Sequence, residues 1–106
     1  MYFCKKYIYM RTTSEIVNIL KAYKPEAEKK YGFKRIGIFG SVARGEQHEG
    51  SDVDVCYEGP ATGLFTFVGI KMELEQLLGC NVDLVRERPD MDDILKNDIR
   101  RDAIYV

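Results

Sequence analysis

Apolar side chains recur every three or four residues in three parts of the chain, which predicts amphipathic helices. The first such part follows Thr12 and Glu15, which have the spacing of a capping box, so a helix is predicted to begin near residue 13. Its apolar positions are Ile16, Ile19, Leu20 and Tyr23. Pro25 suits a first turn better than a helix interior, so a second short helix is predicted to begin there and to end at Gly32.

Two more helices are predicted in the second half of the chain. One has Lys71, Glu73, Glu75 and Gln76 on its solvent side and ends at Gly79, and its apolar stripe is Phe67, Ile70, Leu74, Leu77 and Leu78. The other is predicted to start at Asp90 with Asp93. Its apolar positions are Ile94, Leu95 and Ile99.

Short apolar or alternating segments between these helices predict four strands, at residues 35–39, 51–57, 81–85 and 103–106. Side chains alternate between the two faces of an extended chain. Asp52 and Asp54 are therefore expected on one face of a half-buried second strand, with Val53 and Val55 on the other. In the third strand, Asp83 is expected to face away from its apolar neighbours.

The length and charge of the chain narrow its class. We expect 106 residues to form one domain, 1–106, without disulfides. The net charge of −1 offers no broad positive field for a nucleic-acid backbone, so extended nucleic-acid binding is not expected, whereas a small nucleotide is compatible. No apolar run is long enough for a membrane span. Cys4, Cys56 and Cys80 are interpreted as reduced thiols, which favours a cytoplasmic protein.

Gly40 and Ser41 directly follow a predicted strand and are expected to open a helical turn. Unpaired backbone N–H groups at such a turn favour an anion, and Gly40 allows a phosphate to approach the backbone closely. Ser41 adds a hydroxyl donor, Arg44 adds a charge one turn later, and Gly45 is expected to end the turn. A glycine-serine turn after a strand is more often only geometry, and no Walker-type lysine follows it.

Three carboxylates change this interpretation. Asp52 and Asp54 lie roughly 6.5 to 7 Å apart along one strand face, close enough to share a cation. Asp83 lies within an otherwise apolar strand, where an unpaired charge is costly. If the two strands are neighbours with these faces aligned, three carboxylates meet beside the Gly40 turn and favour a divalent cation. Magnesium fits best, because it prefers a few carboxylates together with substrate phosphates.

These residues resemble the motifs of the nucleotidyltransferase superfamily of DNA polymerase beta. The similar segments are Gly40-Ser41, Ala43-Arg44-Gly45, Ser51-Asp52-Val53-Asp54 and Val82-Asp83-Leu84-Val85. Within that superfamily, the chain looks most like the minimal nucleotidyltransferases (MNT) of prokaryotes. The likeness covers nearly the whole chain.

The resemblance implies an α/β (α+β) palm fold with a short mixed sheet flanked by helices, and a two-magnesium transfer of a nucleoside monophosphate from ATP. It implies that Gly40 and Ser41 hold the β- and γ-phosphates, with Arg44 and Ser51 as further nucleotide-binding residues. Asp52 and Asp54 would bind both magnesium ions. Asp83 would hold the ion that activates the attacking hydroxyl.

The acceptor is expected to come from a partner, because 106 residues leave no room for the extra domains of larger relatives. For the minimal group, the resemblance implies a HEPN-type ribonuclease toxin, to which the antitoxin transfers AMP on a tyrosine. Two alternatives stay open. The chain could be a binding module that neutralises its partner by covering it, or it could modify RNA or a small molecule.

Some residues give no decisive signal. Residues 1–9 fit either an upstream extension or a segment that packs on a partner. His48 in a polar loop is interpreted as solvated, and Tyr105 as a packing residue in preference to a site of self-modification.

Overall fold

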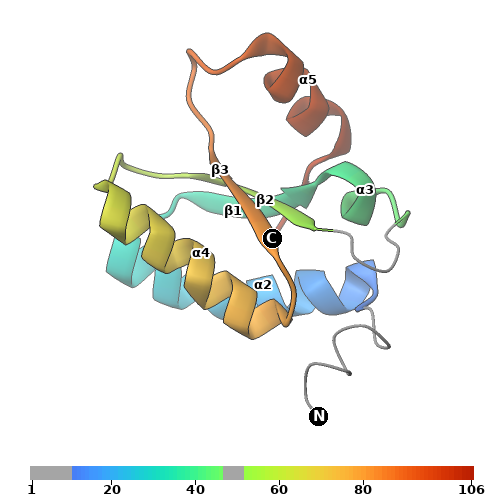
Figure 1. Ribbon diagram of the computed structural model, residues 1–106, viewed down its shortest axis with the longest axis horizontal. Coiled ribbons are helices and arrows are strands. Elements are labelled where there is room, and N and C mark those ends of the chain that lie inside the picture. Colours follow the sequence, from blue (N-terminus) through green and yellow to red (C-terminus); the bar gives the residue numbers. More distant parts are fainter. Residues whose placement is uncertain (1–10, 47–51) are drawn as a thin grey trace.

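A four-stranded mixed sheet with strand order β3-β2-β1-β4 lies at the centre of the computed structural model, which describes residues 11–46 and 52–106 (Figure 1). β1 pairs antiparallel with β2 and β4, whereas β2 pairs parallel with β3. The expected mixed sheet is confirmed. The elements are α2 (Thr13–Tyr31), β1 (Arg35–Phe39), α3 (Gly40–Ala43), β2 (Val53–Glu58), α4 (Leu64–Leu78), β3 (Val82–Arg86), α5 (Asp93–Asp102) and β4 (Ile104–Tyr105).

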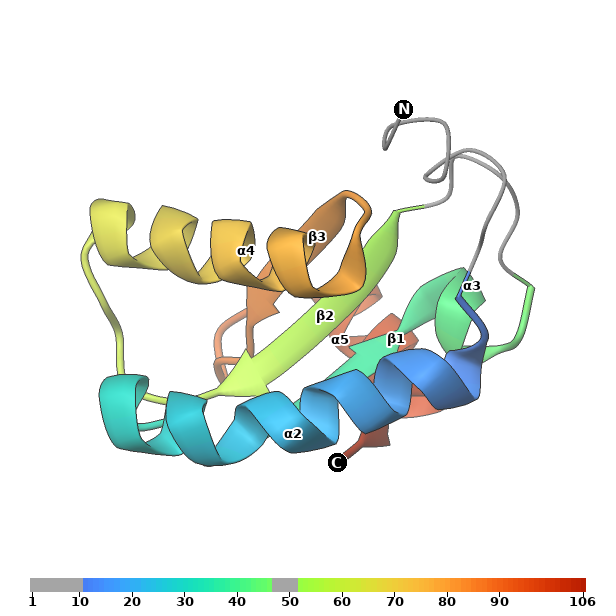
Figure 2. The ribbon, with the colours of Figure 1, turned by 90° about the horizontal axis from the view of Figure 1, so that it is seen from below.

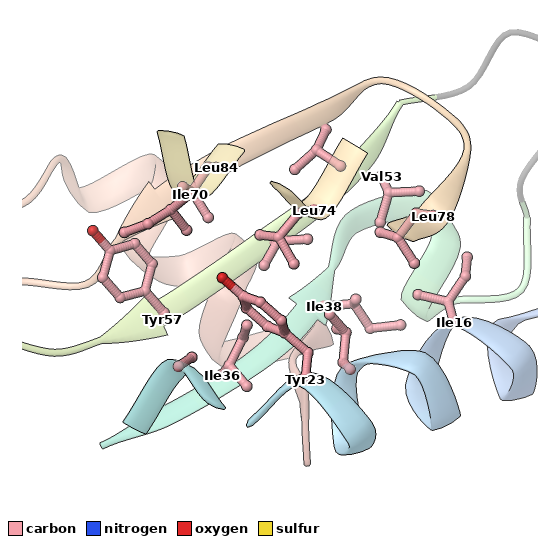
Figure 3. Packing of buried hydrophobic residues seen from close by; sticks show 14 of the residues in the cluster. Ile16, Tyr23, Ile36, Ile38, Val53, Tyr57, Ile70, Leu74, Leu78 and Leu84 are labelled. Atoms are coloured by element: carbon pink, nitrogen blue, oxygen red, sulfur yellow. The ribbon is translucent and has the colours of Figure 1, made fainter. Parts of the chain in front are cut away.

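Helices cover both faces of the sheet. α2 and α4 lie side by side on one face, and α5 lies on the other (Figures 1 and 2). The larger core lies between the sheet and the α2/α4 layer, where Leu74 and Leu78 of α4 and Ile16 of α2 approach Ile38 and Val53 (Figure 3). A smaller cluster lies under α5 and consists of Phe39, Cys56, Met91 and Ile99. Of the described helices, none has the length and apolar character needed to cross a bilayer.

The start of α2 is as predicted, but its extent is not. The Thr12 side chain accepts from the backbone N–H of Glu15, and the Glu15 side chain accepts from the backbone N–H of Thr12. The helix then continues through Pro25 to Tyr31, so the prediction of a break at Pro25 was wrong. Tyr23 and Ala27 are buried on the same face as the earlier apolar residues of α2. Their packing therefore outweighs the hydrogen bond that the proline ring removes.

The two later helices differ from the predicted pattern in detail. Leu77 is 43% exposed and Ile94 is 73% exposed, so neither belongs to the core to which periodicity assigned it. Leu78 and Ile99, which periodicity also assigned to the core, are buried. The cap of α5 is Asp92, whose carboxylate accepts from the backbone N–H groups of Ile94 and Leu95, and the predicted start at Asp90 was two residues too early.

β2 is buried on both faces over most of its length, although its alternation predicted a half-buried strand. Val53 and Val55 are buried as expected, but Cys56 is fully buried on the opposite face as well. α5 packs over that face and covers the Cys56 thiol. Asp54 lies on the same face as Cys56 and is half-buried. Cys56 and Cys80 are both free thiols, and Cys80 is only half-buried.

Candidate active site

Two of the three predicted carboxylates lie directly opposite each other in the sheet. The parallel register of β2 and β3 pairs Asp54 with Asp83, so both side chains leave the same face. Asp54 is half-buried, whereas Asp83 on the edge strand and Asp52, just before β2, are exposed. The condition that the strands be neighbours with aligned faces is therefore met.

The Gly40 turn lies against this pair because of the register between β1 and β2. Phe39, the last residue of β1, pairs with Asp54, and α3 begins at the next residue. Gly40 has a φ of 74°, and a Cβ atom there would collide with Oδ2 of Asp54. Only glycine combines this backbone conformation with that close approach.

The first turn of α3 is open for an anion. Phe39 occupies the N-cap position and offers no side-chain acceptor to the N–H groups of the turn. Ser41 is half-buried in this turn. The Thr13 hydroxyl of α2 donates to the Val42 carbonyl at 2.6 Å, which fixes α3 against the larger helix. Gly45 closes the turn, also with a φ of 74°, as predicted.

The Asp54 carboxyl group is hard to ionise. Burial first, then the negative charges of Asp83 and Asp52, raise its pKa from the usual 3.8 to about 6, and the Arg44 charge opposes this shift. The folded protein therefore holds a proton that the unfolded chain releases between about pH 4 and pH 6. Stability falls as the pH rises through that window. A group with this property is suited to bind a cation, because the cation removes the repulsion.

We expect Asp54→Asn to stabilise the metal-free protein. At pH 7 the substitution removes a half-buried charge and its repulsion, which we put at about 1 to 2 kcal/mol after solvent screening, or roughly 4 to 12 °C in melting temperature. At pH 4 the wild-type carboxyl group is largely protonated, so the gain should vanish. Thermal melts in EDTA at both pH values measure the difference.

Asp98→Asn is the matched control, because Asp98 lies on α5 and, among residues 11–46 and 52–106, its ion-pair partner is the exposed Arg101. It should show no such pH-dependent gain. An Asp54→Asn melting temperature equal to that of the wild type at pH 7 would show that the carboxylates do not repel each other as inferred.

Arg44 is engaged by carboxylates of the chain itself. Its Nη1 lies 2.6 Å from Oδ2 of Asp102, and its Nε lies 2.9 Å from Oε1 of Glu46. These two partners raise the pKa of Arg44. The guanidinium thus joins the end of α3 to the end of α5. Its positive charge also acts on Asp54, where it lowers the pKa. Its predicted phosphate contact stays a prediction, and Ser51 lies outside the described residues.

Asp102 is the site residue that sequence reasoning missed. Its side chain is only 5% exposed and accepts from both Arg44 and Arg101. The pair Arg44 and Asp102 is separated by 58 residues in the chain. No local pattern signals such a contact, because it exists only once α5 folds over the sheet.

The donor set fits magnesium. Asp52, Asp54 and Asp83 offer only carboxylate oxygens, which are the hard ligands that this ion prefers. Among residues 11–46 and 52–106, no three His, Cys, Asp or Glu side chains already form a closed metal-binding group. The predicted meeting of three carboxylates is thus an adjacent pair with Asp52 nearby. Such an open set leaves coordination positions for substrate phosphates and water.

Comparison with known families agrees with this geometry. A family model described as a nucleotidyltransferase domain matches residues 20–106. The chain belongs to this family and is a nucleotidyltransferase. It is 40% identical over 98 residues to the protein adenylyltransferase MntA of Thermococcus cleftensis, an alignment that covers 92% of this chain and 98% of the relative.

Solved structures share the fold. One is described as a candidate minimal nucleotidyltransferase and superposes with a TM-score of 0.73 at 32% identity, covering 89% of this chain and 95% of that chain. Another comes from a complex between an MNT antitoxin and a tri-AMPylated HEPN toxin of Shewanella oneidensis. It has a TM-score of 0.57 at 18% identity and covers 88% of this chain and 66% of that chain, a likeness that concerns the fold alone.

Proposed function

We propose that this nucleotidyltransferase transfers AMP from ATP to a hydroxyl group of a partner protein. The observation that carries the proposal is the alignment of Asp54 with Asp83 beside a turn at which only glycine fits. The likeness to the adenylyltransferase MntA supports AMP as the transferred group. The toxin complex of the same fold motivates the further proposal that the acceptor is a tyrosine of a HEPN-type toxin, for which this protein is the antitoxin.

Each site residue has a role in this proposal. The N–H groups of the Gly40 turn and the Ser41 hydroxyl donate to the triphosphate, and the missing Cβ of Gly40 lets the phosphates lie against Asp54. Asp52, Asp54 and Asp83 would hold magnesium, which neutralises the phosphates and stabilises the in-line displacement when bound. Asp83 is exposed on the edge strand, so a hydroxyl group of a partner can approach it, and in this proposal it would hold the ion that activates that hydroxyl.

The transfer is a single displacement at the α-phosphorus. The acceptor oxygen forms a bond to the α-phosphorus as the bond from that phosphorus to the bridging oxygen of the β-phosphate breaks. Pyrophosphate leaves with the bonding electrons, and the hydroxyl proton passes to solvent. Arg44 keeps α3 and α5 together during this step through its contact with Asp102.

Intact-mass spectrometry tests the proposal. A HEPN-type toxin is incubated with this protein, ATP and magnesium, and its mass should increase by whole AMP units, with peptide mapping locating the label on a tyrosine. Asp52→Asn should abolish the label, and the surface control Asp98→Asn should keep it.

A stable complex with no change in mass would contradict the proposal in favour of a module that neutralises its partner by covering it. Neutralisation that survives the loss of Asp52 would have the same meaning. Transfer of labelled AMP from ATP to RNA, with none on the protein, would show that the acceptor class is wrong.

A further inference from the structure

A groove of about 490 Å³ lies on the α5 face of the sheet, the face that also holds the carboxylates. It opens at the other end of the strands, between α5 and the residues that begin β1 and follow β3. Side chains from five parts of the chain contribute to its lining. Those that matter here are Arg35, Glu87, Arg88, Lys96, Arg100 and Tyr105.

The two acidic groups of the groove share one guanidinium. Both carboxylate oxygens of Glu87 accept from the Tyr105 hydroxyl, at 3.0 and 3.1 Å, and one also accepts from Arg35 at 3.2 Å. Arg35 lies 3.3 Å from Glu58, and its guanidinium stands 4.2 Å from the centre of the Tyr105 ring. One guanidinium thus serves two carboxylates, so one negative charge stays uncompensated on the floor of the groove, fewer than the two positive charges of Lys96 and Arg100.

The α5 side of the groove carries the positive charges of Lys96 and Arg100. Lys96 and Arg100 are four residues apart, so they lie on one face of the helix. Lys96 donates to the Pro89 carbonyl at 2.9 Å, which satisfies a hydrogen bond but no charge. Within residues 11–46 and 52–106, neither side chain forms an ion pair. Like charges at this spacing repel each other, and an anionic ligand between them would relieve that repulsion.

The groove lies within reach of the carboxylates. Glu87 follows Asp83 by four residues along the β3 edge, and Glu58 follows Asp54 by four residues along β2. At about 3.3 Å per residue, the separation is about 13 Å along one face. Ile99 and Met91 cover the middle of this face, but Val85 on the edge strand is only half-buried. An extended peptide of about four residues could therefore run along β3 from the groove to Asp83.

We propose that this groove binds an acidic segment of the acceptor protein, close in sequence to the hydroxyl group that receives AMP. The inference rests on the proposed function and adds to it the means by which the acceptor is recognised. A carboxylate-bearing peptide fits better than a nucleic acid, because a protein with a net charge of −1 has no extended positive field for a nucleic-acid backbone.

Steady-state kinetics with the double variant Lys96→Glu and Arg100→Glu test the proposal. We expect KM for the protein acceptor to rise about tenfold or more, because the reversed charges repel the segment and slow its association. KM for ATP and kcat at saturating acceptor should stay within about twofold, because the carboxylates and the Gly40 turn are untouched.

The double variant Lys21→Glu and Lys29→Glu is the matched control. It makes the same change in net charge on α2, on the opposite face of the sheet, and Lys29 lies in the last turn of its helix as Arg100 does. This control should leave KM for the acceptor unchanged. An equal rise in both double variants, or a rise in neither, would overturn the groove as the docking site.

A binding experiment separates this inference from the proposed function. Fluorescence anisotropy measures the affinity of a labelled glutamate-rich peptide containing one tyrosine, without ATP. Binding to the wild type that is lost in Lys96→Glu with Arg100→Glu supports the groove even if no AMP transfer occurs. Failure of the wild type to bind this peptide, or equal binding of a lysine-rich peptide or of a single-stranded RNA, would overturn it.

Discussion

Asp83→Asn is expected to lower kcat/KM for AMP transfer by about 10³-fold or more and to leave the protein folded. The side chain is exposed on an edge strand, so the amide costs no core packing. The substitution removes one of the three carboxylates that would hold the cation near the acceptor. A bound metal ion stabilises the transition state by several kcal/mol. A loss of 10³ corresponds to about 4 kcal/mol.

The loss should lie in kcat, with KM for ATP changed little. The Gly40 turn and Asp54 remain in place in this variant, so the triphosphate keeps its contacts. Thermal melts should show a protein at least as stable as the wild type, because a repulsion with Asp54 is removed. Retention of a tenth or more of the wild-type activity would show that Asp83 does not hold an ion that the transfer requires.

Gly40→Ala is expected to lower AMP transfer by about 100-fold, because displacements near 1 Å at an active site cost that much. The new Cβ would occupy the place of Oδ2 of Asp54, so either the turn or the carboxylate must shift. The positive φ of 74° adds backbone strain of about 1 kcal/mol. Both the melting temperature and the initial rate of transfer should therefore fall.

Gly45→Ala separates these two causes. Gly45 has the same φ of 74°, but a Cβ there meets no atom within 4 Å. This variant should lose stability from backbone strain and keep its transfer rate within a few-fold. Equal losses of activity in the two variants would show that the contact with Asp54 is not the reason for glycine at position 40.

Part of the site could be predicted because its signals are local. A glycine-serine pair after a strand, two alternating aspartates and an aspartate within an apolar strand are each visible over a few residues. Their meeting depended on the two strands being neighbours with aligned faces, a condition that the sequence left open and that the register of β2 with β3 meets. The capping box of α2 and the glycine that ends α4 are equally local signals.

Other features depend on contacts between distant residues. The helix passes Pro25 because Tyr23 and Ala27 are buried against the sheet, a gain that local propensity does not include. The exposure of Ile94 has the same origin, since periodicity shows that a helix has an apolar side but not which turn meets the core.

The four strands, the turn at Gly40 and the carboxylates that a cation requires follow from local sequence, because backbone conformation and side-chain chemistry are set over short stretches. Three other features arise only when the chain folds: Arg44 is held by Asp102, Asp54 resists ionisation, and a basic groove shares the face of the carboxylates. The contact of Arg44 and the groove depend on how α5 packs over the sheet, and the pKa of Asp54 depends on its burial and on the nearby charges of Asp83 and Asp52. Burial and charge proximity are properties of the folded chain, and no short segment contains them.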